Sequence, residues 1–502
     1  MRRRIEKPNQ LALMLPTVLL LFARLPRCLS LATTASPTTL SPLPSDLEIF
    51  SVAPMMAHTN RHHNRYFRHF SERAHLYTEM IPAETVASLY RRGNALDRNE
   101  ELRGLLGIFP SRDPNDGPII LQLGGRNPET LALASEIGVA MGYDAINLNC
   151  GCPSDAVSGR AGGCALMRDP GHVAEIVERM SEGISLAEEQ HSRVGKVKLS
   201  VKHRLGVRDA STYDASADRA KNDEEAFREC DQFVRAITHN SRVGSLQVHA
   251  RVGLIGGFVP DRDESTALWT PSSSFSSPSS GCVTPKKIDH KREQHKAKKR
   301  ARKATLDNRS VPPLRPEVVN HLAEKYPKLD FVTNGGIKSM DDIYRRTSGT
   351  NVVGAMVGRA VINHPCSFSH VDELWGQDSS LPPWTREDVL SSHIDYCIKE
   401  EARIEGRRPA SYLHELRRRL VAVPFSLFAG EEGNDAYQRA IRKLANRLGS
   451  GRHSAAAILQ GALIHVPAEV RAKPITEFAS MDGIRTYTEF NQRSGPMQRA
   501  IL

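Results

Sequence analysis

Short apolar runs recur along the chain from about residue 50 onward, and each ends in Gly, Pro, Asn or a charged residue. Stretches of helical character, such as residues 127–142 and 170–184, separate most of them. The eight runs occupy residues 50–56, 75–80, 118–125, 145–151, 196–204, 245–251, 330–336 and 351–359. Eight strands that alternate with helices predict an α/β fold, the (β/α)8 TIM barrel, whose reacting groups lie where the strands end.

A doubly wound open sheet would produce the same alternation of strands and helices. Such sheets usually carry a dinucleotide fingerprint, G-x-G-x-x-G, directly after the first strand. The fingerprint is absent from this chain. The barrel is therefore the favoured interpretation, and we assign it to residues 46–370.

The chain continues without strands from about residue 384. Residues 384–406, 410–430 and 434–450 are amphipathic and predict helices. Residues 407–452 carry ten Lys or Arg and four Asp or Glu, a net charge of +6. We expect a small all-α domain with a basic face over residues 380–465, followed by a tail, residues 466–502. A helical cap on the barrel with an ordinary solvated surface is the alternative.

The barrel pattern is interrupted at residues 263–306. The first half of this segment is rich in Ser and Pro, and residues 286–303 carry ten Lys or Arg against two acids. Neither half can bury a core, which predicts a disordered basic insertion. It would add nonspecific affinity for RNA or form a plain solvated loop.

The first 45 residues differ from the rest in composition. A basic start precedes an apolar run, residues 11–23, that contains Pro16 and is too short for a standard spanning helix. We interpret the segment as a targeting sequence, secretory-type or organellar; a disordered or misannotated extension is the alternative. A transit peptide would place the mature chain, without a membrane segment, in a mitochondrion or plastid; otherwise it is expected in the cytoplasm.

The overall composition adds a preference for an anionic partner. The 502 residues carry a net charge of +11, and 40% of them are hydrophobic, enough for a substantial core. A basic protein of this kind favours nucleic acid, unless basic tails inflate the sum. The eight cysteines are few for this length and do not form a disulfide framework, which indicates a reducing compartment.

Three of these cysteines fall within residues 147–167. They form one C-x-C pair and a third cysteine twelve residues later, with no nearby His. This spacing argues against a zinc site. Cys150 ends a strand and is expected to pack inward, and Cys164 begins an apolar helix and is expected to be buried. Cys152 stands between a glycine and a proline just past the strand, where a thiol would meet a ligand at the barrel mouth. From the residues alone, Cys152 is either structural or catalytic.

Glycines after the last two runs indicate a phosphate site. Gly335 and Gly336 follow the seventh run, and Gly358 with Arg359 follows the eighth. Barrels commonly hold phosphate at the loops after strands seven and eight, where glycine leaves backbone N–H groups uncovered and arginine supplies a forked donor. Together these residues predict a phosphate-bearing ligand.

Polar side chains end the third, fifth and sixth runs. Gln122 carries an amide that can pair with a ring edge. The cations are Lys202 and Arg204 after one run and His249 and Arg251 after the next. Cations at a barrel mouth would stabilise a reduced flavin or a pyrimidine carbonyl, although ordinary surface charge would give the same pattern.

The motifs as a set resemble those of the tRNA-dihydrouridine synthases. The resemblance runs from about residue 50 to 370, more loosely to about 465, and is to the bacterial A-type branch, which acts at positions 20 and 20a of the tRNA D-loop. It is carried by "APMMAHTNRHHNRYFRHFSERAHLYTEM", "LQLGGRNPETLALA", "YDAINLNCGCPSDAVSGRAGGCALM", "VKHRLGV", "VHAR", "NGGIKS" and "GAMVGRAVINHP".

The resemblance implies a monomeric enzyme in which NADPH reduces FMN, a helical domain grips tRNA and a uridine is flipped into the barrel. Hydride would pass from the flavin to C6 of uracil, and Cys152 would protonate C5. By the same matching, Pro54, Met55 and Met56 should line the isoalloxazine, and Gln122, Lys202 and His249 should contact the ring and ribityl chain. The matching further implies phosphate contacts from Asn334, Gly335, Gly336, Gly358 and Arg359, and places Asn149 and Arg204 near the flavin or the base.

Two departures from the family pattern bear on position specificity. Val252 stands where the branch usually has a lysine, and the basic insertion follows in the same loop. Two rival functions remain compatible with the residues. One is an FMN barrel acting on free pyrimidines, which the basic helices argue against; the other is a tRNA-binding chaperone that relies little on chemistry.

Overall fold

The computed structural model describes residues 47–92, 100–107, 116–154, 157, 162–192, 195–220, 223–239, 241–256, 312–376, 381–445 and 453–478. The predicted targeting segment, residues 1–45, and the basic insertion, residues 263–306, lie outside these ranges. Within them, no helix is both long and apolar enough to cross a membrane.

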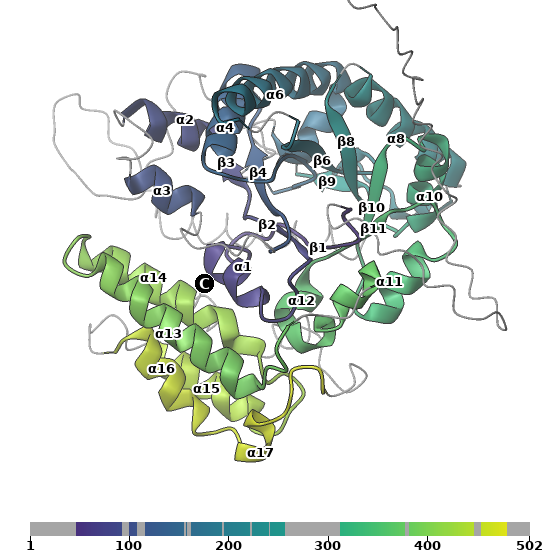
Figure 1. Cartoon of the computed structure of the whole chain (residues 1–502). Helices are drawn as coiled ribbons and strands as arrows, with labels where there is room; N and C mark the ends of the chain where they lie inside the picture. The colour runs from purple at the N-terminus through teal and green to yellow at the C-terminus, as the bar shows by residue number, and fades with distance from the viewer. Residues whose placement is uncertain are drawn as a thin grey trace, which may run out of the picture.

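Eight parallel strands close into a barrel (Figure 1). Pairing follows chain order among these eight and returns from the last to the first, and every neighbouring pair is parallel. Each strand overlaps one of the eight predicted runs, so the (β/α)8 prediction is confirmed. The strands are β1 (Phe50–Val52), β2 (His75–Tyr77), β4 (Ile119–Gly124), β5 (Ala145–Cys150), β6 (Lys198–Arg204), β8 (Val243–His249), β10 (Asp330–Asn334) and β11 (Gly354–Val357).

The barrel interior holds apolar and polar side chains together. Six residues from different strands or their ends form a small apolar cluster of their own: Ala53, Tyr77, Ile120, Ala145, Val332 and Met356. Asn147 and Gln247 are fully buried as well. Because side chains two apart on a strand share a face, Asn149 and His249 lie on the same face as these amides, nearer the mouth.

Helices cover the outside of the barrel (Figure 1). They are α2 (Ala83–Arg92), α4 (Pro128–Ala140), α6 (Pro170–Gln190), α8 (Asp223–Thr238), α10 (Pro316–Lys325), α11 (Met340–Thr347) and α12 (Arg359–Asn363). Asn127 and Asp169 cap α4 and α6, and each precedes a proline at the first helical position. Their side-chain oxygens accept N–H groups that would otherwise lack partners, which explains why these helices begin there.

Several short elements escaped prediction because two to seven residues carry too little periodicity. β7 pairs with β9 and thereby joins the loops that follow β6 and β8. β3 extends the sheet beside β4. The short elements that escaped prediction are β3 (Ile81–Pro82), β7 (Val207–Asp209), β9 (Gly253–Ile255), α1 (Arg61–Phe67), α3 (Glu100–Leu106), α7 (Ala215–Ala220) and the 3-10 helices η3 (Pro365–Phe368) and η4 (Val371–Trp375). The 3-10 helix η2 (Gly163–Arg168) lies where a helix beginning at Cys164 was predicted.

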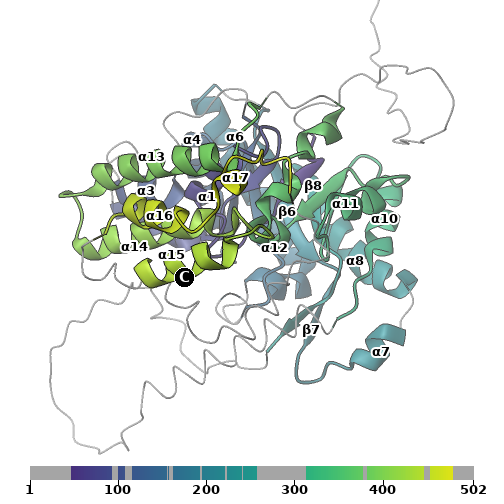
Figure 2. The same cartoon turned by 90° about the horizontal axis from the view of Figure 1, so that it is seen from below.

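The C-terminal helices form a bundle beside the barrel (Figures 1 and 2). They are α13 (Arg386–Ile404), α14 (Ala410–Ala422), η5 (Val423–Ser426), α15 (Asn434–Ala445), α16 (Ala455–Leu463) and α17 (Ala468–Arg471). The three predicted amphipathic stretches correspond to α13, to α14 with η5, and to α15. The chain stays on the bundle to the end of the described part: Arg386 donates to the carbonyl of Pro474 at 2.8 Å, within the segment assigned to the tail.

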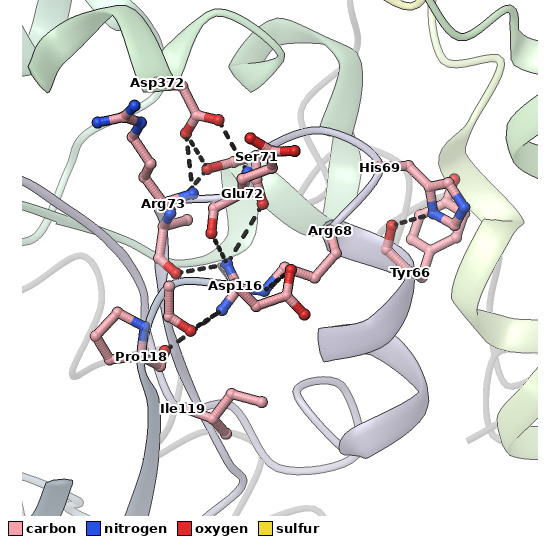
Figure 3. A network of polar contacts seen from close by, with 12 residues as sticks. Tyr66, Arg68, His69, Ser71, Glu72, Arg73, Asp116, Pro118, Ile119 and Asp372 are labelled. Atoms are coloured by element: carbon pink, nitrogen blue, oxygen red, sulfur yellow. Dashed lines mark hydrogen bonds and ion pairs between the residues drawn. The ribbon is translucent and has the colours of Figure 1, made fainter. Parts of the chain in front are cut away.

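The segment between α1 and β2 is held in place by buried polar contacts (Figure 3). Arg68 donates to the carbonyls of Ala74 at 2.8 Å and Gly117 at 2.7 Å, which joins the approaches to β2 and β4. Asp372 of η4 accepts the backbone N–H of Glu72 at 2.9 Å. These bonds fix the segment after α1 against the approaches to β2 and β4 and against η4.

Candidate functional site

The turn after β5 presents Cys152 and buries Cys150. The side-chain oxygen of Asn149 accepts the backbone N–H groups of Gly151 and Cys152, each at 2.9 Å. An Asn side chain that bonds its own backbone two and three residues on fixes a tight turn. Cys150 is fully buried, as predicted, whereas Cys152 is only partly so. The turn therefore separates a packing cysteine from one at the mouth.

Burial raises the pKa of the Cys152 thiol above its ordinary value. A backbone hydrogen bond from Ser154 and the charges of Arg204 and Lys202 act in the opposite direction, and burial prevails. Burial disfavours the thiolate because a charge loses its hydration. The thiol is therefore protonated at neutral pH. The positive charges of Arg204 and Lys202 would stabilise the thiolate that proton loss would leave.

The third cysteine of this region supports the loop. Cys164 is buried, as predicted, although its helix is the 3-10 helix η2. Its backbone N–H donates to the carbonyl of Cys152 at 2.9 Å. Gly163 makes this approach possible, because a Cβ there would lie 2.4 Å from the same carbonyl oxygen. In the described part of the chain, no three or more His, Cys, Asp or Glu side chains are grouped so that they could hold a metal ion.

Gln122 on β4 contacts the cysteine turn through Asn149. The Asn149 amide donates to the Gln122 side-chain oxygen at 3.2 Å, and the Gln122 amide donates to Asn147 at 2.8 Å. Gln122 is buried, and both ends of its amide have protein partners. Gln122, whose amide was predicted to face a ring, therefore also orients Asn149, which shapes the turn.

Lys202 and Asn334 meet across the strand that separates them. Nζ of Lys202 donates to the side-chain oxygen of Asn334 at 3.2 Å, and Asn334 donates to the carbonyl of Met356 at 2.7 Å. Burial, followed by the charge of Arg204, lowers the pKa of Lys202 to about 7. A lysine with such a pKa favours an anionic ligand, which would restore its full charge.

Arg204 clamps the two loops beside the mouth. Its guanidinium donates to the carbonyl of Gly151 at 2.7 Å and to that of Val252 at 3.1 Å. The side chain is buried. Val252, where a lysine was expected, is also buried and receives this bond through its backbone. Arg204 thus holds the cysteine turn to the loop after β8.

His249 lies on the cationic side of the barrel mouth, but its own ring is neutral. Burial lowers its pKa well below the ordinary value, and the nearby charges of Arg204, Lys202, Arg251 and Arg359 act in the same direction. Its ring lies against the backbone of Gly335, where a Cβ would come within 2.7 Å of the ring carbon. The structure therefore brings the sixth and seventh strand ends together.

The two glycines after β10 adopt backbone conformations that favour glycine. Gly335 and Gly336 have φ values of 113° and 73°, which L side chains rarely adopt. Gly358 precedes α12, and Arg359 is exposed. Met55 lies close to this turn, with its sulfur 3.6 Å from the position of a Cβ on Gly358. Loops after β1, β10 and β11 thus share one region.

The segment after β1 turns sharply at the predicted ring-facing residues. The backbone N–H of Met55 donates to the Thr59 hydroxyl at 2.9 Å, and Ala57 has a φ of 65°. Pro54 and Met55 are half-buried, whereas Met56 is 60% exposed. Met56 is thus the most open of the three and has the least contact with the protein.

Sequence reasoning missed a row of buried polar residues inside the barrel. Asn147 and Gln247 stand two positions before Asn149 and His249 on the same strands. Glu48 lies just before β1 and bonds to Gln247. The period-two pattern of "INLNC" and "LQVHA" was the available signal, because it places these side chains on the interior face.

The arginines of α14 have acidic partners. Arg417 is paired with Glu401 at 2.6 Å, and Arg418 and Arg419 lie 4.0 Å and 3.1 Å from Glu415. These pairs neutralise part of the positive charge that composition assigns to the helical region. The surface of α14 is therefore less cationic than its sequence indicates.

Fold and site together define a class: (β/α)8 barrel proteins with a thiol and a group of cations at the carboxyl ends of the strands. The family model for dihydrouridine synthase (Dus) matches residues 51–226 and 300–444, more than half of the chain. The chain belongs to the dihydrouridine synthase family.

Curated relatives agree with this assignment. A protein of Xanthomonas axonopodis pv. citri is 31% identical over 402 residues, which cover 80% of this chain and 90% of the relative. A Synechocystis protein is 29% identical over 398 residues, covering 79% and 89%. A Pseudomonas putida protein is 29% identical over 371 residues, covering 74% and 83%. All three are named tRNA-dihydrouridine(20/20a) synthase.

Proposed function

We propose that this protein reduces uridine to 5,6-dihydrouridine in the D-loop of tRNA, at positions 20 and 20a, with FMN as cofactor and NADPH as reductant. The observation that carries the proposal is the partly exposed, protonated Cys152 on a clamped turn near Arg204 and Lys202. The names of the relatives support the choice of substrate and position.

The residues at the mouth fit FMN. Gly335 and Gly336 have positive φ values in a tightly packed turn, where a Cβ would collide with the His249 ring or with Leu314, and Arg359 after β11 is exposed. Uncovered backbone N–H groups with an arginine suit a phosphate. Lys202 and Gln122 would hold the isoalloxazine ring and the ribityl chain of FMN. Pro54 and Met55 would pack against the apolar face of the ring. Membership of the family adds to this support.

The chemistry that we assign to the chain is a proton transfer. When bound and reduced, FMN supplies a hydride to C6 of uracil. The Cys152 thiol then gives its proton to C5, and the S–H electron pair stays on sulfur. Arg204 and Lys202 stabilise the resulting thiolate, which solvent reprotonates after the product leaves. Asn149 holds the thiol at its place through the backbone of the turn.

Binding of tRNA requires the target base to leave its stack and enter the mouth. The chain's net charge of +11 supports an anionic macromolecule as partner. We assign the grip on tRNA to the C-terminal bundle, with the protein acting as a monomer.

Residues 1–45 would direct the protein to a mitochondrion or plastid. A reporter fused to residues 1–50 is the test of this part. Import into either organelle supports it, and a cytosolic reporter contradicts it.

The decisive experiment is mass spectrometry of dihydrouridine after incubation of unmodified tRNA with residues 46–502, FMN and NADPH. Cys152→Ala should reduce product formation by about 100-fold or more, as expected for loss of a general acid. Cys164→Ala is the matched control, because it removes a neighbouring thiol and keeps the backbone bond to Cys152. Turnover of free uracil, or no product from a flavin-loaded wild type, would contradict the proposal.

A further inference from the structure

A chain of side-chain amides crosses the barrel interior from the cysteine turn to its floor. It begins at Asn149, which accepts two backbone N–H groups of the turn and donates to Gln122. Gln122 in turn donates to Asn147 at 2.8 Å. We call this set the amide chain; its members are Asn149, Gln122, Asn147 and Gln247.

The amide chain ends on a carboxylate. Asn147 donates to the side-chain oxygen of Gln247 at 2.9 Å, and Gln247 donates to Glu48 at 2.8 Å. Glu48 also accepts the hydroxyl of Tyr77 at 2.9 Å. Glu48 is 8% exposed, and the amides of Asn147 and Gln247 are fully buried. No water is therefore needed to complete these bonds.

Every link of the amide chain runs in the same direction. The backbone N–H groups of Gly151 and Cys152 can only donate, so Asn149 must turn its oxygen toward them. Its NH2 group then faces Gln122, and the same requirement passes along each amide. The last NH2 group, on Gln247, has two hydrogens to place: Glu48 accepts from it at 2.8 Å, and the hydroxyl of Ser245 accepts from the same nitrogen at 2.8 Å.

We propose that Glu48 is a positioning residue: its acceptor oxygen at the barrel floor satisfies the end of the amide chain in the direction that the turn requires, and thereby stabilises the turn that carries Cys152. Amides flipped at any link would bring two donors together, and an unpaired buried donor costs about 1–3 kcal/mol. Glu48 touches neither the thiol nor the mouth, and it acts through Gln247. The role in catalysis rests on the proposed function; the role in holding the turn does not.

Two breaks and two controls test the inference. Glu48→Met removes the acceptor at nearly constant size, and Gln247→Met breaks the chain one link further on. Glu48→Gln restores an acceptor oxygen. Tyr77→Phe removes the other bond to Glu48 and leaves the amide chain intact. If one Met variant does not fold, the other still decides.

The first readout is independent of activity. Hydrogen exchange at the N–H groups of Gly151 and Cys152 reports directly on their bonds to Asn149. We expect exchange at least about fivefold faster in both Met variants, and within about twofold of wild type in Glu48→Gln and Tyr77→Phe. Unchanged exchange in both Met variants, or equally fast exchange in Tyr77→Phe, would overturn the inference.

The second readout is the single-turnover rate of dihydrouridine formation at saturating tRNA. We expect it to fall about tenfold in the Met variants, while FMN content, the rate of FMN reduction by NADPH and the KM for tRNA stay within about twofold. Glu48→Gln should recover the wild-type rate. A Met variant with altered exchange and full activity would remove the catalytic role, and a wild type without product would instead refute the proposed function.

Discussion

Nζ of Lys202 lies 3.2 Å from the side-chain oxygen of Asn334, so that strands β6 and β10 present one joint polar site above the strand between them. Asn334 is neutral, and Arg204 is near enough to depress the pKa of Lys202 further. Asn334 therefore does not neutralise the positive charge of protonated Lys202. An anionic ligand would neutralise it.

The affinity for FMN should accordingly depend on pH. The pKa of Lys202 is about 7 without ligand, and an anionic ligand raises it, so that binding takes up a proton above neutrality. The dissociation constant should rise by up to about tenfold per pH unit above about pH 7, where the FMN phosphate no longer titrates. Fluorescence titration measures it, and Lys202→Met should bind weakly with a flat profile. An unchanged slope in Lys202→Met would contradict the assignment.

Gly335 offers a test of the phosphate cradle. Alanine there must adopt a φ of 113° and would place its Cβ 2.7 Å from the His249 ring. Gly349→Ala is the matched control, because Gly349 has a φ of 70° with open space around it. Gly349→Ala should lose about 1–2 kcal/mol of stability in urea unfolding, and Gly335→Ala should lose at least as much, because its Cβ also meets the His249 ring. Only Gly335→Ala should also weaken FMN binding, by about tenfold or more; equal FMN affinities would place the phosphate elsewhere.

Much of this arrangement follows from the period-two pattern. The runs at residues 145–151 and 245–251 predicted β5 and β8, and alternation placed Asn149 and His249 at strand ends. The strand order of the closed barrel follows from the alternation with helices. Gly335 and Gly336 after β10 have φ values that L side chains rarely adopt, which accounts for the residue type at these positions.

Contacts distant in the sequence could not be read in this way. The bond between Gln247 and Glu48 joins residues 199 positions apart, and its existence depends on the side-chain conformations of both. His62 and Tyr396, which are 334 positions apart, meet only because the bundle packs on α1. No local pattern encodes either pairing. Arg204 shows the same limit: its position at a strand end was predicted, and its two backbone partners were not.

Two buried histidines, His69 after α1 and His393 on α13, should make the protein sensitive to acid. His69 bonds to Ser392 at 2.9 Å, and His393 bonds to the carbonyl of Leu420 at 2.9 Å. Burial lowers the pKa of His69 to about 4 and that of His393 to about 3. Between these values and the ordinary 6.5, the unfolded chain binds protons that the folded chain does not. Stability should therefore fall as the pH falls from 6.5 toward 4.

Replacement of one histidine should reduce this acid sensitivity. Each such group contributes a slope of about 1.4 kcal/mol per pH unit. His69→Gln retains a donor for Ser392 and does not titrate, so that it should lose up to about 2–3 kcal/mol less than wild type between about pH 6.5 and pH 4.5. Urea unfolding followed by circular dichroism measures the difference. His370→Gln, at an exposed site, is the control, and equal slopes for all three proteins would contradict the prediction.

Glu48 should act on stability with the opposite sign. Burial raises its pKa to about 7, with Asp330 adding to the shift and bonds from Tyr77 and Gln247 opposing it. Between 4.5 and 7 the folded chain holds a proton that the unfolded chain has lost, so the carboxyl's contribution to stability falls as pH rises through this window. Glu48→Gln removes this loss, and its gain in free energy of unfolding over wild type should be up to about 3 kcal/mol larger at about pH 8 than at about pH 4.5. Urea unfolding midpoints at both pH values measure this difference.

Tyr77→Phe, which removes a bond to the carboxylate, should show the reverse trend with pH, because the ionised form of Glu48 then has one hydrogen-bond donor fewer. A pH-independent difference between wild type and Glu48→Gln would mean that Glu48 keeps an ordinary pKa in the folded protein. The activity of Glu48→Gln, measured at both pH values, separates two properties of this residue. One is its charge, which costs stability, and the other is its acceptor oxygen, which the amide chain requires.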